Sequence, residues 1–180
     1  ALSRSAKTIP AVVEFVDIAG LVRGAAEGEG LGNQFLAHIR ETDMITEVVR
    51  IFDDENVTHV SGAVDPLADI DAVNLELVLK DLETVSKRLA SLEHDIKRGD
   101  KKAAEEAALL ARAREHLEKG QLTHAFVLGE NERAGLAGLA LLTLKPILYV
   151  LNKKAGGHNL DEHNDERWDA LMRFFTESGS

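Results

Sequence analysis

Cysteine is absent from this 180-residue sequence, so disulfide frameworks and cysteine-based zinc or redox sites are excluded. Long apolar runs are absent too: none approaches the roughly 18 residues that a membrane helix needs. Residues 1–5 begin without an apolar stretch of the kind found in secretory signals. We therefore expect a cytoplasmic protein with no membrane partner.

Positive charge is also in short supply. The 31 acidic and 21 basic residues give a formal net charge of −10, which argues against a strongly basic nucleic-acid module but leaves room for a local basic patch. Hydrophobic residues make up 44% of the chain, enough for one domain with a real core and too many for a disordered tail.

Three apolar segments have the composition of buried strands: residues 11–17, 44–52 and 146–151. Helical patterns separate or follow them at residues 33–42, 129–142 and 161–176. In the last pattern, Trp168, Leu171, Met172 and Phe175 fall on one face. Strands that alternate with helices predict a parallel α/β sheet. Nearly a hundred residues separate the second and third strands, so we expect a helical insertion there.

The insertion has the pattern of two long helices. Its first helix follows a 3-4 spacing typical of an a/d seam, carried by Leu75, Leu79, Leu82, Leu89, Leu92 and Ile96, with Val85 or Ser86 in the missing position. Gly99-Asp100 predicts a helix stop followed by a new N-cap. The second helix, near residues 101–119, has a stripe of Ala103, Ala107, Leu110, Arg114 and Leu117. So short a turn predicts an antiparallel helical hairpin that projects from the domain.

A glycine-rich stretch follows the first predicted strand. Asp17 ends the strand, and Gly20, Gly24, Gly28, Gly30 and Gly32 follow it. In nucleotide hydrolases, the Asp of such an Asp-x-x-Gly holds Mg²⁺ through water, and the Gly amide donates to the γ-phosphate. The four residues alone also fit an ordinary strand-to-helix connection.

Longer motifs favour the first interpretation. Residues 14–36 (EFVDIAGLVRGAAEGEGLGNQFL) closely resemble the switch II region of Obg-related P-loop NTPases. Residues 39–43 (IRETD), 59–66 (HVSGAVDP) and 142–146 (LTLKP) look like the YchF/Obg-like ATPase family within that group. The resemblance implies a Ras-like G domain with a parallel sheet and an inserted antiparallel coiled-coil hairpin. It also implies Mg²⁺-dependent hydrolysis of ATP to ADP and phosphate, and binding to ribosomes (the large subunit or the 70S particle) and their rRNA.

On this basis the chain divides into G-domain residues 1–68, the inserted hairpin 69–128, and G-domain residues 129–180. The family's phosphate-binding Gly-x-x-x-x-Gly-Lys-Ser/Thr does not occur in the sequence. We expect it before residue 1, and the family's small TGS domain after residue 180. The 180-residue chain by itself is therefore expected to bind nucleotide poorly and not to turn it over.

Several single residues matter for mechanism. Ras-like enzymes commonly place a water-orienting Gln directly after the Asp-x-x-Gly glycine, but here Leu21 follows. The resemblance points instead to His59, whose neutral imidazole could orient the water. The alternative is a surface-loop histidine.

The third strand leads into Asn152-Lys153-Lys154-Ala155, where GTPases place Asn-Lys-x-Asp and the resembling family has Glu in the fourth position. Ala155 cannot accept from guanine, which disfavours GTP without proving ATP. Asn152 is the leading base-binding candidate, and the stem of Lys153 is expected to cover the base.

Other polar groups carry less weight. His158 and His163 lie near acidic residues, but their spacing matches no established metal-ligand pattern. The hairpin carries eight cations that could face RNA or form an ordinary salt-bridged surface: Lys87, Arg88, Lys97, Arg98, Lys101, Lys102, Arg112 and Arg114. Two further functions remain open, an Obg-type GTPase of ribosome assembly and a non-catalytic, nucleotide-gated interaction scaffold.

Overall fold

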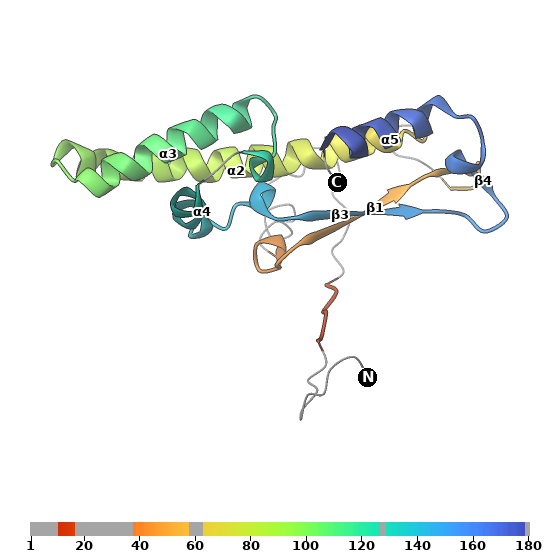
Figure 1. Ribbon diagram of the computed structural model, residues 1–180, viewed down its shortest axis with the longest axis horizontal. Coiled ribbons are helices and arrows are strands. Elements are labelled where there is room, and N and C mark those ends of the chain that lie inside the picture. Colours follow the sequence, from red (N-terminus) through yellow and green to blue (C-terminus); the bar gives the residue numbers. More distant parts are fainter. Residues whose placement is uncertain (1–10, 17–37, 58–62, 127–128, 179–180) are drawn as a thin grey trace.

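The structure, a computed structural model, describes residues 11–16, 38–57, 63–126 and 129–178. Figure 1 shows a long helical hairpin and a shorter helix lying along a small pair of strands. The elements follow one another as β1 (Ile45–Arg50), β2 (Phe52–Asp53), α2 (Pro66–Lys97), α3 (Lys101–Glu118), η1 (Thr123–Ala125), α4 (Glu130–Ala137), η2 (Leu142–Leu144), β3 (Ile147–Asn152), β4 (His158–Asn159), η3 (Leu160–Glu162) and α5 (Glu166–Ser178).

The predicted parallel pairing of the second and third strands is confirmed. β1 and β3 run parallel in a register that places Ile45 beside Ile147 and Arg50 beside Asn152. β2 and β4 form a short antiparallel pair beyond them. Nearly a hundred residues, including the helical insertion, connect the end of β1 to the start of β3.

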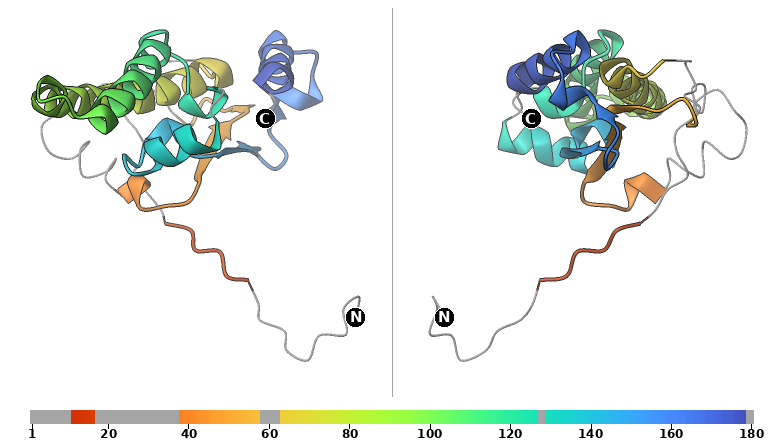
Figure 2. Two further views of the ribbon diagram at one scale, coloured as in Figure 1. Left: turned by 60° about the vertical axis from the view of Figure 1, so that its left-hand side comes forward. Right: turned by 90° about the vertical axis from the view of Figure 1, so that its right-hand side faces the viewer.

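A hydrophobic core lies between the strands and the helices that cover them. Both views of Figure 2 place α2 and α5 on the same side of the strands. Buried residues from β1, α2, η3 and α5 meet there: Val49, Ile51, Ile70, Leu160 and Leu171. Trp168, Met172 and Phe175 pack against them, as the periodicity of the last helix predicts. On the other side of the strands Val48, Leu148 and Val150 are exposed.

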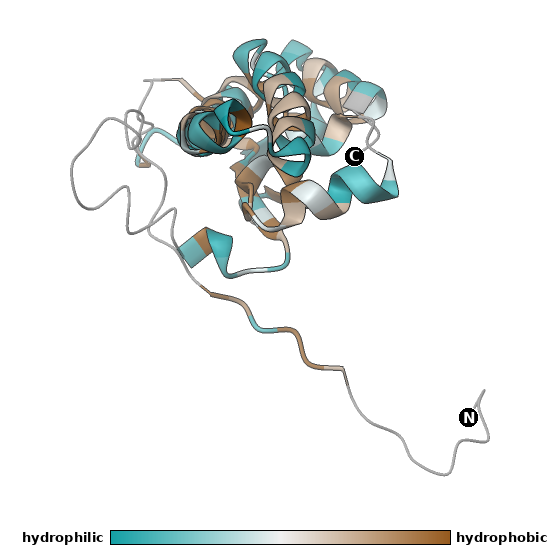
Figure 3. Ribbon diagram, turned by 90° about the vertical axis from the view of Figure 1, so that its left-hand side faces the viewer, coloured by the Kyte–Doolittle hydropathy of each residue, from teal (hydrophilic) through white to brown (hydrophobic). Residues whose placement is uncertain are grey.

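The strand predicted at residues 11–17 is not found over residues 11–16, which have no regular secondary structure. Val12, Val13, Phe15 and Val16 are all exposed. Figures 1 and 3 show this mostly apolar segment extending away from the helices and strands. A strand needs backbone partners, and within the described residues β1 and β3 pair only with each other, so apolar composition alone does not form a strand here.

The turn of the hairpin forms as expected, whereas α2 begins at Pro66, three residues before the expected start at residue 69. Asp65 caps α2 by accepting from the Ala68 amide at 3.1 Å, and proline occupies the first turn. Gly99, with φ of +86°, reverses the chain, and Asp100 caps α3 by accepting from the Lys102 amide at 2.8 Å. Glycine suits this left-handed backbone because it has no Cβ.

The seam of α2 differs from the prediction. Its buried centre is Val78, Val85 and Leu92, spaced by seven residues. Of the predicted seam residues, Val85 and Leu92 are buried, Leu82 and Leu89 are partly buried, and Leu75, Leu79 and Ile96 are exposed. Val78 is the central residue that the predicted seam left out. In α3 the buried stripe is Ala103, Leu110, Ala113 and Leu117, with Ala113 in place of the predicted Arg114. None of the described helices is long and apolar enough to cross a membrane.

Candidate nucleotide site at the carboxyl edge of the sheet

The carboxyl ends of β1 and β3 meet at one edge, because the strands are parallel and in register. Open α/β sheets bind ligands at this edge. Arg50 ends β1 and Asn152 ends β3 as its register partner. Asn152 is exposed, and its backbone carbonyl accepts from the Ile51 amide at 3.0 Å. Its side-chain amide makes no hydrogen bond to the residues that the structure describes, so it remains available to a ligand.

Lys153 lies next to Asn152, and two carboxylates hold its ammonium group. Nζ is 2.7 Å from Asp161 Oδ2 and 2.9 Å from Glu162 Oε1. These contacts raise the pKa of Lys153 and lower that of Glu162. Anchoring the ammonium fixes the far end of the side chain on η3.

The loop after β3 is braced by a residue that sequence reasoning missed. Asn159 is 3% exposed, accepts from the Lys154 amide at 2.8 Å, and donates to the Lys154 carbonyl at 3.1 Å. Gly156, with φ of +66°, makes the turn between them. The ammonium of Lys154 reaches across to Asp54 and lowers the pKa of that carboxyl. An Asn two residues after a Gly-Gly pair is the sequence signal of such a brace.

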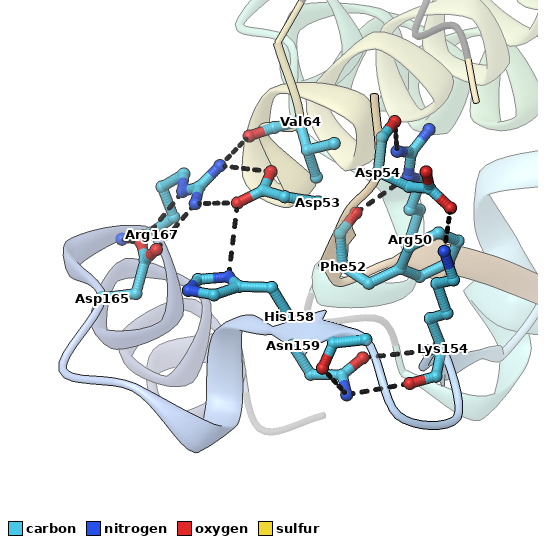
Figure 4. Close-up of polar contacts among 11 residues, drawn as sticks. Arg50, Phe52, Asp53, Asp54, Val64, Lys154, His158, Asn159, Asp165 and Arg167 are labelled. Atoms are coloured by element: carbon cyan, nitrogen blue, oxygen red, sulfur yellow. Dashed lines mark hydrogen bonds and ion pairs between the residues drawn. The ribbon is translucent and has the colours of Figure 1, made fainter. Parts of the chain in front are cut away.

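A second missed residue is Arg167, at the start of α5. Figure 4 shows its guanidinium between the carboxylates of Asp53 and Asp165. Its nitrogens lie 2.8 Å from Asp53 Oδ2 and 2.7 Å from Asp165 Oδ2, and one also donates to the Val64 carbonyl at 2.9 Å. The Arg167 hydrogen bonds lower the pKa of Asp53, and they lower that of Asp165 to about 2. The cluster ties β2, the start of α2 and α5 together.

His158 extends the cluster. Its Nδ1 lies 3.7 Å from Asp53 Oδ2, and its ring stacks on His163 with 3.9 Å between centroids. Within the described residues, no group of three or more His, Asp or Glu side chains could hold a metal ion. The acidic residues of this region form ion pairs with Arg167, Lys153 and Lys154.

Arg50 organises the loop that leaves β1. Its side chain donates to the carbonyls of Phe52 at 2.9 Å and Val57 at 3.0 Å, and the guanidinium lies 4.6 Å from the centre of the Phe52 ring. These hydrogen bonds hold the backbone of the loop from residue 52 to residue 57. Asp17, Gly20 and His59 lie outside the described residues, so the structure places Asn152 and Lys153 side by side and leaves the other predicted site residues unplaced.

Comparison with known proteins decides the family. No protein-family model matches the chain. It is 49% identical over 146 residues to the ribosome-binding ATPase YchF of Bacillus subtilis, covering 81% of this chain and 40% of that protein. It is 44% identical over 160 residues to the YchF of Escherichia coli O157:H7, covering 89% of this chain and 44% of the relative. The chain belongs to the YchF family.

A solved structure agrees with this. The YchF GTPase of Schizosaccharomyces pombe matches with a TM-score of 0.65 and 32% identity over 83% of this chain and 41% of that one. The chain thus spans about two fifths of the length of the YchF proteins it matches.

Proposed function

We propose that this chain is the central part of a cytoplasmic YchF-type ATPase that hydrolyses ATP to ADP and phosphate while bound to ribosomes. The observation that carries the proposal is the 49% and 44% identity to proteins named ribosome-binding ATPases. Residues 1–68 and 129–180 would form the G-domain part, with the hairpin of 69–128 inserted between them.

The base side of the site supports this assignment. Asn152 is exposed at the end of β3, in the position from which it would donate to and accept from the base. The stem of Lys153, anchored at its far end by Asp161 and Glu162, would lie against one face of the base. Ala155 offers no carboxylate to the guanine donors, which favours adenine.

The phosphate side rests on Asp17, Gly20 and His59. Asp17 would hold Mg²⁺ through water, and the ion would neutralise charge on the phosphate oxygens. The Gly20 amide would donate to the γ-phosphate, and the neutral His59 imidazole would accept a hydrogen bond from the attacking water and so orient it. In the full-length protein we expect His59→Ala to lower kcat by about 10²- to 10⁴-fold with little change in ATP affinity. Unchanged hydrolysis would remove His59 from the mechanism. Complete absence of hydrolysis in the parent protein would favour the scaffold function instead.

GTP is the second candidate substrate, because the matching solved structure is titled a GTPase. Competition between ATP and GTP for the full-length protein separates the two. Binding that favours GTP by tenfold or more would overturn the adenine assignment. If the parent prefers ATP, Ala155→Asp should shift its preference towards GTP, because the new carboxylate supplies the missing acceptor for the guanine donors.

The hairpin supports the ribosomal part of the proposal through an uneven distribution of ion pairs. In its stem, Arg88 pairs with Glu106 at 2.6 Å and Arg114 with Glu118 at 3.4 Å. At the tip, Arg98, Lys101 and Lys102 are exposed and make no ion pair within the described part of the chain. Unpaired cations that converge on one turn suit a phosphate backbone.

We therefore propose that the tip contacts rRNA. Replacing Arg98, Lys101 and Lys102 together by Gln should weaken ribosome binding and reduce its dependence on salt, because fewer counterions are released. The matched control replaces the paired stem residues Arg88 and Arg114 by Gln. Equal effects of the two variants on the salt dependence would contradict a specific role for the tip.

A further inference from the structure

Two motifs that mark the family resemblance have no place in the proposed site. They are residues 39–43 and residues 142–146, which are a hundred residues apart in the sequence. The structure brings both against the middle of α2. Ile39, Leu77 and Leu142 are nearly fully buried and form one small core beneath them. Beside this core, polar side chains make two groups of hydrogen bonds, one centred on Asp81 and one on residues 40–42. We call them together the Asp81 junction: Arg40, Asp81, Thr84, Thr143 and Lys145.

Asp81 is the centre of the junction. It is fully buried on α2 and accepts from the Leu142 amide at 2.9 Å and from the amide and hydroxyl of Thr143, both at 2.7 Å. Thr123 continues the chain through its hydroxyl, 2.7 Å from that of Thr143. Burial raises the pKa of Asp81, and its three hydrogen bonds and the charge of Arg40 oppose that rise. A buried carboxylate that lost these donors would be strongly destabilised, so α2 and η2 must keep their relative position or exchange it for another defined one.

The second arm of the junction leads to the segment after the glycine-rich stretch. The Arg40 guanidinium donates to the Thr84 hydroxyl on α2 at 2.7 Å. Lys145 donates to the carbonyls of Arg40, at 3.2 Å, and Thr42. Residues 40–42 are thereby tied to both α2 and the lead into β3.

These contacts join α2 to two segments that lie close in the sequence to residues of the proposed nucleotide site. Residues 40–42 follow Gly32 within ten residues, and Lys145 precedes β3, whose last residue is Asn152. On the other side, α2 continues past Asp81 to the hairpin tip at Lys97, about 24 Å further on at 1.5 Å per residue. A tilt of about 10° at the junction would move the tip by about 4 Å.

We infer that the Asp81 junction is the joint through which nucleotide state sets the position of the hairpin. We assign its residues a positioning role, which acts through α2 and β3. The inference rests on the proposed function, because it requires that the protein bind both. Packed elements that are joined by buried, directional contacts move between discrete relative positions and do not deform continuously. A switch between two states needs this property.

The test uses the full-length protein and purified ribosomes. Ribosome affinity is measured with a non-hydrolysable ATP analogue and with ADP, and the ratio of the two affinities is the readout. Coupling between sites typically gives a ratio of roughly 5- to 150-fold. Arg40→Met and Thr84→Val each remove the same hydrogen bond, the one between Arg40 and α2, from opposite ends. Asp81→Asn places an amide NH₂ against backbone donors. Glu83→Gln is the control, since Glu83 pairs with Lys80 and Lys87 on the exposed side of the same helix.

We expect the ratio to fall towards one in all three junction variants and to stay at the parent value in Glu83→Gln. ATP affinity should remain within about threefold of the parent, a result that a merely damaged nucleotide site would not give. If Asp81→Asn fails to fold, the Arg40 and Thr84 variants still decide the matter. A parental ratio preserved in those variants, or a ratio near one in the parent itself, overturns the inference. A parent that binds no nucleotide at all contradicts the proposed function instead.

Discussion

Replacing Glu47 by Gln should make the protein more stable at alkaline pH and leave it unchanged at acidic pH. Glu47 lies on β1 beside Tyr149 of β3. Its Oε2 is shielded from solvent and has no hydrogen-bond partner among the described residues, and the same holds for Asn74 Oδ1 on α2. Burial, with a smaller contribution from the charge of Asp69, raises the pKa of Glu47 from 4.5 to about 8. The native state therefore favours the neutral carboxyl.

The sign of the effect follows from proton linkage. Between about pH 4.5 and 8 the native state holds the Glu47 proton and the unfolded state has lost it. Stability then falls as the pH rises, by at most about 1.4 kcal/mol per pH unit. Across the whole window the loss is on the order of 4 kcal/mol. Gln has nearly the same shape but no charge, so it removes this loss.

The assay is urea unfolding of the parent and the variant at pH 5, 6.5 and 8.5, followed by the fluorescence of Trp168, the single tryptophan, which packs in the same core as Tyr149. Taking the difference between the two proteins cancels the other titrating groups. The free energies of unfolding should agree within about 1 kcal/mol at pH 5 and separate progressively, with the variant more stable at pH 8.5. Glu105→Gln, at an exposed position of α3, should show no such separation. A difference that is the same at all three pH values would refute the reasoning.

Three further predictions concern the hairpin and the extent of the chain. Leu110→Ala should lower the free energy of unfolding by about 2–5 kcal/mol, because Leu110 is fully buried between the helices. Leu75→Ala, at an exposed position, should change it by about 0.5 kcal/mol or less. Equal losses in urea unfolding would show that Leu75 belongs to the helix interface after all. Asp100→Ala should cost about 0.5–2 kcal/mol by removing the cap of α3, and Asp100→Asn should retain most of it. A fluorescent ATP analogue should bind the full-length protein and bind the 180-residue chain poorly, because the chain lacks the Gly-x-x-x-x-Gly-Lys-Ser/Thr motif. Micromolar binding by the chain would contradict the expectation that this motif is needed.

The sequence predicted most of the local structure because the signals were local. Gly99 and Asp100 each act within a few residues, and together they set the end of α2 and the start of α3 as expected. The two strands of the sheet were also predicted within one or two residues. Periodicity gave the inward face of α5 for the same reason.

The errors arose where a choice depends on partners elsewhere in the chain. Val78 was left out of the predicted seam, and Val85 shared its position there with Ser86, because only packing against α3 selects these valines. The apolar segment at 11–16 was predicted as a strand although no local signal states what would pair with it.

The site was predicted in part. The position of Asn152 and Lys153 after a strand is a local pattern, and in the structure Asn152 is the last residue of β3. Arg167 was missed because its partner Asp53 lies more than a hundred residues away, and no spacing rule connects them. Asp81 was missed because a single acid on a charged helix looks solvent-exposed until its donors from η2 are known.

The placement of the hairpin between β1 and β3 has a consequence for folding. The two strands pair across about a hundred residues, a non-local contact with a large loss of chain entropy and a slow search. α2 and α3, by contrast, are joined by a short turn and can associate early. Because α3 returns the chain towards the place where α2 began, early association shortens the effective loop between the strands. Early formation of the hairpin would thus bring β1 and β3 together. Substitutions that destabilise the hairpin should therefore slow refolding more than equally destabilising substitutions in a surface loop.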